Sequence, residues 1–253
     1  MTGSEPATWF AFDNPWEVIA LVGVVVSLRV AVPRVPALSK WRAAILEFVD
    51  SGLIAALLVF CLLRPFVIQA FYIPSGSMEP TLLEGDRILV NKFIYFFRDP
   101  RAGEIIVFNA PPQASEDNKD FIKRVVGVAG DRLQVRKHIQ GVQPGGLIRN
   151  GQLVNEPYLA EPPDYYWPRV SGEFVHMGGG EVKYLEADDE FIVPPGHLVM
   201  MGDNRNNSND SHRWARRYHE TDQWVSDPFL PRENVLGKAM VIFWPPQRIR
   251  LLH

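Results

Sequence analysis

The stretch "FIKRVVGVAGDRLQVR" (Phe121–Arg136) has the sequence of a strand, a turn and a second strand. β-branched residues recur in both halves, and Gly130 and Asp131 stand between them as turn residues. Most glycines and prolines of the chain follow Pro65, which favours a turn-rich architecture. We therefore predict a mainly β protein. Similar strand-like stretches are "DRILVNKFIYFF" (Asp86–Phe97), "GEIIVFNAP" (Gly103–Pro111) and "NVLGKAMVIFWPP" (Asn234–Pro246).

The middle of this β region differs in composition. Residues 141–180 are rich in glycine, proline and aromatic side chains, and "NGQLVNEPY" (Asn150–Tyr158) suits a hairpin turn followed by a strand. We expect an all-β main domain made of residues 64–138 and 187–253. Residues 139–186 would form a small β subdomain inserted into it.

Two apolar segments precede the β region, "WEVIALVGVVVSLRVAV" (Trp16–Val32) and "AAILEFVDSGLIAALLVFCLL" (Ala43–Leu63). We predict transmembrane helices over 16–32 and 43–63, although two buried helices of a soluble domain are the alternative. Residues 1–15 would then be an N-terminal tail, and residues 33–42 a connector.

Charged residues beside these segments predict their orientation. The tail has acidic residues but no lysine or arginine, whereas Arg29, Arg34, Lys40 and Arg42 surround the connector. The positive-inside rule places the connector in the cytoplasm, so that the N-terminal tail and everything after Leu63 lie outside. The N-terminus also lacks the basic region of a cleavable signal peptide, and we expect the anchor to be retained.

Composition argues against several other classes of protein. The net charge is −3, with no long basic run, so the sequence gives no sign of a nucleic-acid partner. Cys61 is the only cysteine, which excludes a disulfide framework and a thiolate metal cluster. The six histidines show no HExxH spacing, and we expect no metal and no cofactor.

Ser77 and Lys123 are the first candidate site residues. Ser77 lies in "IPSGSMEPTL", where turn chemistry is the ordinary explanation of a serine, but a neighbouring base would make it a nucleophile. In a strand, Lys123 shares a face with Phe121 and Val125. Apolar surroundings lower a lysine pKa and would let Lys123 act as a base. A solvated basic pair of Lys123 and Arg124 is the alternative.

A third stretch, "GDNRNNSNDSH" (Gly202–His212), is dense in turn-forming residues. Its Asp-x-Asn-x-Asn pattern resembles the start of a calcium loop. However, the glycine at position six and the glutamate at position twelve of an EF-hand are absent, which makes calcium binding a weak alternative.

In this order, and behind two apolar segments, these stretches resemble those of bacterial type I signal peptidases. "IPSGSMEPTL" resembles the nucleophile box of that family, "DFIKRVVGVAGD" its lysine box, "GDNRNNSNDS" its third box and "GKAMVIFWPP" its closing strand. The resemblance covers about 64–135 and 191–244 and is weak in the insertion. It implies a serine protease with a Ser/Lys dyad.

The resemblance also implies a role for individual residues. Ser77 would be the nucleophile and Lys123 the general base. Ser75 would donate to the oxyanion beside the backbone N–H of Ser77. Ser208 would orient Lys123, and Arg124 and Asp203 would form a supporting ion pair near Asp210. The substrate cleft would be lined by Ile73, Pro74, Met78, Leu82, Phe121 and Ile122.

Two positions depart from a well-known relative. Phe121 replaces a tyrosine, which keeps the cleft wall but loses a hydroxyl. His212 replaces an arginine that pairs with the aspartate corresponding to Asp210, so a pairing here would vary with pH.

The implied function is membrane-anchored removal of N-terminal signal peptides from translocated preproteins, with cleavage after a small residue in an Ala-x-Ala-like site. The reaction would pass through an acyl-enzyme and need no cofactor. The implied location is the bacterial cytoplasmic (inner) membrane. The catalytic domain would be on the periplasmic face, in contact with lipid and near the secretion translocon.

Two other functions fit parts of the sequence. A self-cleaving Ser/Lys protease of the SOS-repressor type shares the dyad, but it is soluble and often carries a DNA-binding domain, of which no helix-turn-helix is apparent here. A membrane-tethered β module that binds peptides without cutting them is the second alternative. Both dyad residues are present, which disfavours it.

Overall fold

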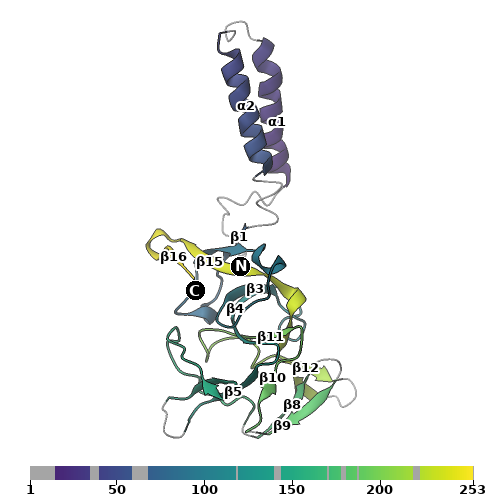
Figure 1. Cartoon of the computed structure of the whole chain (residues 1–253), viewed down its shortest axis with the longest axis vertical. Helices are drawn as coiled ribbons and strands as arrows, with labels where there is room; N and C mark the ends of the chain where they lie inside the picture. Colours follow the sequence, from purple (N-terminus) through teal and green to yellow (C-terminus); the bar gives the residue numbers. More distant parts are fainter. Residues whose placement is uncertain are drawn as a thin grey trace, which may run out of the picture. The chain divides into compact units, whose positions relative to one another are not determined.

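A computed structural model describes residues 15–34, 40–58, 68–117, 119–139, 144–169, 171–177, 181–186, 188–218 and 223–252. The chain divides into two compact units, Met1–Val67 and Ile68–His253 (Figure 1). Cys61, most of the predicted N-terminal tail and the end of the predicted second transmembrane segment lie outside the described residues.

The first unit is a helical hairpin. It contains α1 (Pro15–Ala31), η1 (Val32–Arg34) and α2 (Arg42–Leu57). Arg29 of α1 forms an ion pair with Asp50 of α2, and the Arg42 guanidinium donates to the carbonyl oxygen of Pro33 at 2.7 Å. These contacts hold the last turn of α1 beside the first half of α2.

Helices occur at both positions where transmembrane helices were predicted, 16–32 and 43–63, but they are 17 and 16 residues long. Crossing a bilayer takes about 20 residues of mainly apolar helix. None of the helices in the described parts of the chain has the length and hydrophobicity for a crossing.

The second unit is mainly β, which confirms the predicted class. Its largest sheet has eight strands in the order β1-β2-β15-β3-β4-β11-β14, with β16 paired to β15. Register shifts along β15 mark β-bulges, which bend and twist a strand. The strands are β1 (Ile68–Tyr72), β2 (Arg87–Asn91), β3 (Ile105–Asn109), β4 (Asp120–Val128), β11 (His197–Met201), β14 (Phe229–Pro231), β15 (Val235–Trp244) and β16 (Arg250–Leu251).

Two smaller sheets complete this unit, β10-β5-β6-β7 and β12-β13-β8-β9. Strands from residues 139–186 enter both sheets, and each sheet also contains strands from outside that range. The predicted hairpin turn is present between β6 and β7, where Asn150 and Gly151 both have positive φ. The strands are β5 (Arg132–Arg136), β6 (Gly146–Arg149), β7 (Gln152–Leu153), β8 (Glu173–His176), β9 (Val182–Leu185), β10 (Phe191–Ile192), β12 (Ala215–Tyr218) and β13 (Gln223–Ser226).

Strand β4 occupies a central place in the large sheet, between β3 and β11. Lys123 is opposite Ile106 of β3, and Arg124 is opposite Met201 of β11. From Lys123 to Gly127 every residue of β4 is buried, so both faces of the strand are covered. The sheet therefore carries two basic side chains into the interior of the β unit.

Candidate active site

Ser77 lies on a short 3-10 turn, η4 (Gly76–Met78), shortly after β1. The backbone at Ser75 is extended and leads directly into this turn. Met78 and Leu82 are fully buried in a core cluster with Ile73, whereas Ser77 is only half-buried. Burial of the apolar neighbours therefore fixes the turn and leaves the Ser77 side chain accessible.

Lys123 points from β4 toward this turn. Its Nζ donates to Ser77 Oγ at 2.8 Å and to the carbonyl oxygen of Ile122 at 2.8 Å. Only 5% of Lys123 is exposed, and the Phe121 ring lies 5.3 Å from Nζ. Burial lowers the pKa of Lys123 to about 8, against the opposing charges of Asp210 and Asp203. Roughly one such lysine in ten is neutral at pH 7, compared with fewer than about one in a thousand in water.

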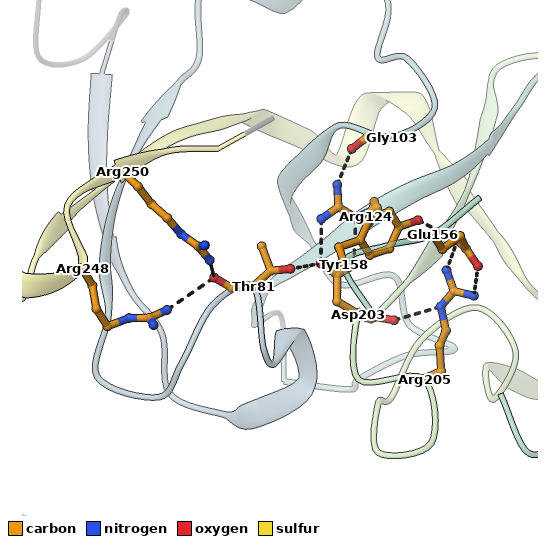
Figure 2. Close-up of polar contacts among 10 residues, drawn as sticks. Thr81, Gly103, Arg124, Glu156, Tyr158, Asp203, Arg205, Arg248 and Arg250 are labelled. Carbon is orange, nitrogen blue, oxygen red and sulfur yellow. Dashed lines mark hydrogen bonds and ion pairs between the residues drawn. The ribbon is translucent and has the colours of Figure 1, made fainter. Parts of the chain in front are cut away.

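Arg124, next to Lys123, forms a buried bidentate ion pair. Its Nε and Nη2 donate to the two carboxylate oxygens of Asp203 at 2.8 and 2.6 Å. Nη1 donates to the carbonyl oxygen of Gly103 at 2.7 Å, and the guanidinium stacks 3.8 Å from the centre of the Tyr158 ring (Figure 2). Thr81 Oγ1 also donates to Asp203, at 2.5 Å. Asp203 thus links β4 to the segment that follows Ser77.

The loop after β11 holds the Ser77 turn directly. The backbone N–H of Asn204 donates to the Ser77 carbonyl oxygen, and its side-chain amide donates to the Gly76 carbonyl oxygen, both at 3.1 Å. Gly202 approaches so closely that a Cβ atom there would lie 2.3 Å from Ser208 Oγ and 2.4 Å from the Ser77 carbonyl oxygen. A side chain at position 202 would push the loop away from the turn.

Asp210 is fully buried in the same loop. Its carboxylate accepts hydrogen bonds from the Gly202 N–H at 2.8 Å and is 2.6 Å from His212 Nδ1. Burial disfavours its charged form, but these hydrogen bonds outweigh burial and hold the pKa of Asp210 below its ordinary value. His212 therefore takes the position beside Asp210 that the resemblance implied.

Ser208 is buried beside Gly202, but the hydrogen bond predicted between Ser208 and Lys123 is not formed. In the part of the chain that the structure describes, Ser208 Oγ has no hydrogen-bond partner. Its hydroxyl is near the Asp210 carboxylate, outside good hydrogen-bond geometry.

The residues predicted to line a cleft fall into two groups. Ile73, Met78 and Leu82 pack into the core beneath the Ser77 turn, with Ile122 against the same cluster. Phe121 packs instead against Phe108, in a second cluster that also contains Trp214. Pro74 and Ser75, which precede the turn, are exposed.

Several residues around the dyad did not emerge from the sequence. Thr81 and Asn204 lie inside recognised motifs but have no reactive group, and Glu156 and Tyr158 lie in the insertion. Glu156 forms a buried ion pair with Arg205 (Figure 2). In the sequence, Glu156 lies in the "NEPY" that follows the predicted hairpin turn. Nothing in that stretch indicates that Glu156 pairs with Arg205.

The arrangement suits acyl transfer. A serine hydroxyl and a buried lysine of lowered pKa are in hydrogen-bond contact, as nucleophilic catalysis requires. The carboxylates of Asp203 and Asp210 are engaged by protein donors. Among the described residues, no group of three or more His, Cys, Asp or Glu side chains is placed to hold a metal ion.

Comparisons with known proteins agree with this chemistry. Residues 45–244 match the family "Signal peptidase, peptidase S26". The chain is 38% identical over 202 residues to the probable signal peptidase I-2 of Synechocystis sp., covering 79% of this chain and 74% of the relative. Identity to signal peptidase I is 36% over 222 residues for Pseudomonas aeruginosa (76% and 71% covered) and 34% over 248 residues for Mycobacterium tuberculosis (82% and 75% covered). The chain belongs to the signal peptidase I family of S26 serine endopeptidases.

Proposed function

We propose that this signal peptidase removes signal peptides with Ser77 as the nucleophile and Lys123 as the general base. Removal of signal peptides is the activity of the family, and preproteins that carry them are its substrates. The observation that supports the two roles best is the 2.8 Å contact between Lys123 Nζ and Ser77 Oγ in a buried setting. A general base must lie within hydrogen-bond reach of the proton that it removes, and Lys123 meets this condition at Ser77.

In the first half of the reaction, neutral Lys123 takes the proton of Ser77 Oγ as this oxygen attacks the scissile carbonyl carbon. The protonated lysine then gives its proton to the leaving amine, and the mature protein departs. The signal peptide remains joined to Ser77 as an ester. In the second half, Lys123 takes a proton from water, the hydroxide attacks the ester, and Ser77 recovers its hydrogen.

We assign stabilisation of the oxyanion to the Ser75 hydroxyl and the backbone N–H of Ser77. The exposed Ser75 precedes the turn in extended conformation, so its side chain is free to meet the developing charge. Donors that act only in the transition state typically contribute about 10²–10³ in kcat. The pocket for the residue before the cleaved bond would be walled by Pro74, Phe121 and Ile122, above the buried Ile73, Met78 and Leu82. A confined apolar pocket of this kind favours small residues such as alanine.

Ser208, Arg124, Asp203 and Asp210 would act as supporting residues. The bidentate pair of Arg124 and Asp203 anchors the loop that carries Ser208, and Asp210 holds Gly202. Ser208 Oγ, without a partner in the described structure, is available to meet Lys123 once the lysine changes protonation state.

Members of this family are membrane-associated. We propose that the α1 and α2 segments lie in the bacterial cytoplasmic membrane, with the connector in the cytoplasm and the β unit on the periplasmic face, near the translocon. Exposed apolar residues on α1 and α2, such as Val24, Leu28 and Phe48, suit a lipid environment. In the β unit, further exposed apolar side chains lie on or beside β1, η5 (Ile94–Phe96), β15 and β16: Ile68, Tyr72, Phe93, Phe96, Phe97, Trp244, Ile249 and Leu251.

Protease protection tests this orientation. In right-side-out vesicles that contain the full chain, added protease should degrade the β unit, whereas in inverted vesicles the β unit should be protected. Protection in right-side-out vesicles would contradict the assigned face.

Cleavage of a labelled preprotein tests the two catalytic roles. Wild type should release the signal peptide, and Ser77→Ala and Lys123→Ala should be silent while keeping the wild-type melting temperature. Substantial activity in Lys123→Ala would mean that another group is the base. Binding without cleavage by folded wild type would favour a peptide-binding module instead.

A further inference from the structure

Residues 156–165 of the insertion, which we call the strap, lie against the loop 202–212. The Asp164 N–H donates to Asn206 Oδ1 at 2.9 Å, and the Asn206 amide donates to the Pro162 carbonyl oxygen at 3.1 Å. These contacts join two segments that are more than forty positions apart in the chain. The strap therefore packs on the same loop that forms hydrogen bonds with the Ser77 turn.

The first end of the strap holds the loop by a buried ion pair. Arg205 Nη1 donates to Glu156 Oε2 at 2.8 Å, and Nη2 donates to the other carboxylate oxygen. The side chains of Glu156 and Arg205 are only 4% and 0% exposed. The remaining donor, Arg205 Nε, reaches the carbonyl oxygen of Gly202 at 3.1 Å. Glu156 thus orients the Arg205 guanidinium, and this guanidinium in turn holds the Gly202 carbonyl oxygen.

The second end of the strap holds the loop by ring stacking. The Tyr165 ring lies parallel to the His212 ring, with centroids 4.1 Å apart and an interplanar angle of 8°. His212 Nδ1 pairs with Asp210, whose other oxygen accepts the Gly202 N–H. This second chain of contacts therefore ends at the backbone N–H of Gly202, whereas the first ends at its carbonyl oxygen.

Between the two ends, the strap also covers the ion pair beside the base. The Tyr158 ring stacks on Arg124, and the Tyr158 hydroxyl donates to Glu156 at 2.6 Å (Figure 2). A cation stacked on an aromatic face and shielded from water is held more firmly than an exposed one. Arg124 is thus fixed by Asp203 on one side and by the strap on the other.

We propose that the strap is a positioning element of the active site, in which Glu156 and Tyr165 act through Arg205 and His212 to hold Gly202 against Ser77 and Ser208. Both carbonyl and amide of Gly202 are held by groups that the strap orients. The close approach of Gly202 to the Ser77 carbonyl and to Ser208 transmits this constraint to the nucleophile. Displacement of the loop would expose Lys123, which is now buried, to water. The insertion is then required for catalysis, in addition to any contribution that it makes to the stability of the β unit.

This inference rests on the proposed roles of Ser77 and Lys123. The variants Ser77→Ala and Lys123→Ala test those roles with the strap intact, so a failure of one proposal is distinguishable from a failure of the other. The strap itself is tested by Glu156→Gln in the full chain. That substitution keeps the size of the side chain and removes the charge that holds Arg205.

We expect Glu156→Gln to lower kcat on the order of 10²-fold with little change in KM, as a misplacement of about 1 Å would. We also expect the acidic limb of kcat/KM to move up by roughly one pH unit, because water that reaches Lys123 reduces the effect of burial on its pKa. The charges of Asp210 and Asp203, which oppose the effect of burial on the pKa of Lys123, are present in both the wild type and Glu156→Gln. If Glu156→Gln only reduced the amount of folded protein, activity would fall by the same factor at every pH. The acidic limb of kcat/KM would then stay at its wild-type position.

Glu186→Gln is the matched control, since Glu186 is an exposed glutamate of the insertion outside the strap, and it should behave as wild type. Glu156→Asp should recover part of kcat. If Glu156→Gln does not fold, the double variant Glu156→Leu/Arg205→Met replaces the buried pair by apolar side chains, an exchange that folded proteins often tolerate. It should melt like wild type and show the same loss of kcat. Wild-type kcat and an unmoved acidic limb in either folded variant would overturn the proposal.

Discussion

Replacing Gly202 with alanine should disable the active site without unfolding the protein. The new Cβ would lie 2.4 Å from the Ser77 carbonyl oxygen and 2.3 Å from Ser208 Oγ. Ordinary contacts between such atoms are about 3.5 Å, so the loop and the turn must separate by roughly 1 Å. Ser208 Oγ can rotate away, but the Ser77 carbonyl belongs to the backbone of the nucleophile and must move with it.

A displacement of this size in an active site costs on the order of 10²-fold in rate, which corresponds to about 2.7 kcal/mol of transition-state stabilisation. We therefore expect kcat/KM for a labelled preprotein to fall on the order of 10²-fold in Gly202→Ala, mostly through kcat. Gly52→Ala in α2 is the matched control, because a Cβ there meets nothing within 4 Å and alanine is the better helix former.

Melting temperature and near-UV circular dichroism would establish that the variant remains folded. A folded Gly202→Ala with the kcat/KM of wild type would refute the reasoning. It would mean that the loop absorbs the extra methyl group without moving Ser77, and that the close approach of Gly202 has no bearing on the nucleophile.

Two further predictions concern single groups. The activity of wild type should rise with pH to a plateau whose midpoint is near the pKa of Lys123, about 8, since only neutral lysine accepts the Ser77 proton; a kcat/KM profile flat between pH 6 and 9 would contradict this. Tyr165→Phe should keep full activity and gain roughly 1 kcal/mol of stability in denaturant unfolding, because the buried hydroxyl has no partner in the described residues. Tyr165→Leu, which removes the ring stacked on His212, should lose activity.

The sequence predicted the parts of the site that lie in contiguous motifs. Local patterns singled out Ser77 and Lys123 only as candidates, a serine in a turn and a lysine on the apolar face of a strand. Their proposed roles came from the resemblance of the ordered motifs to type I signal peptidases. Asn150 and Gly151 predicted their hairpin from a local pattern, since a two-residue turn with positive φ favours asparagine and glycine.

Contacts between distant segments were not predictable in this way. Glu156 and Arg205 are 49 positions apart, and only the folded chain brings them together. The order of strands in the large sheet, with β15 between β2 and β3, likewise depends on pairing that no local pattern encodes. The transmembrane helices predicted over 16–32 and 43–63 rested on hydropathy and on the charges beside the segments, and the described helices at those positions are shorter than a bilayer requires.

The placement of Lys123 in a buried central strand has a consequence for the timing of activity during synthesis. In the proposed mechanism, Lys123 is a base only while it is buried, and its burial needs β11 and the loop 202–212, which leave the ribosome long after Ser77. Until those segments dock, the lysine stays protonated and the serine stays inert. A chain that is still being synthesised is therefore inactive. In the proposed mechanism, the chain acquires the ability to cut peptide bonds only when nearly all of the β unit has folded.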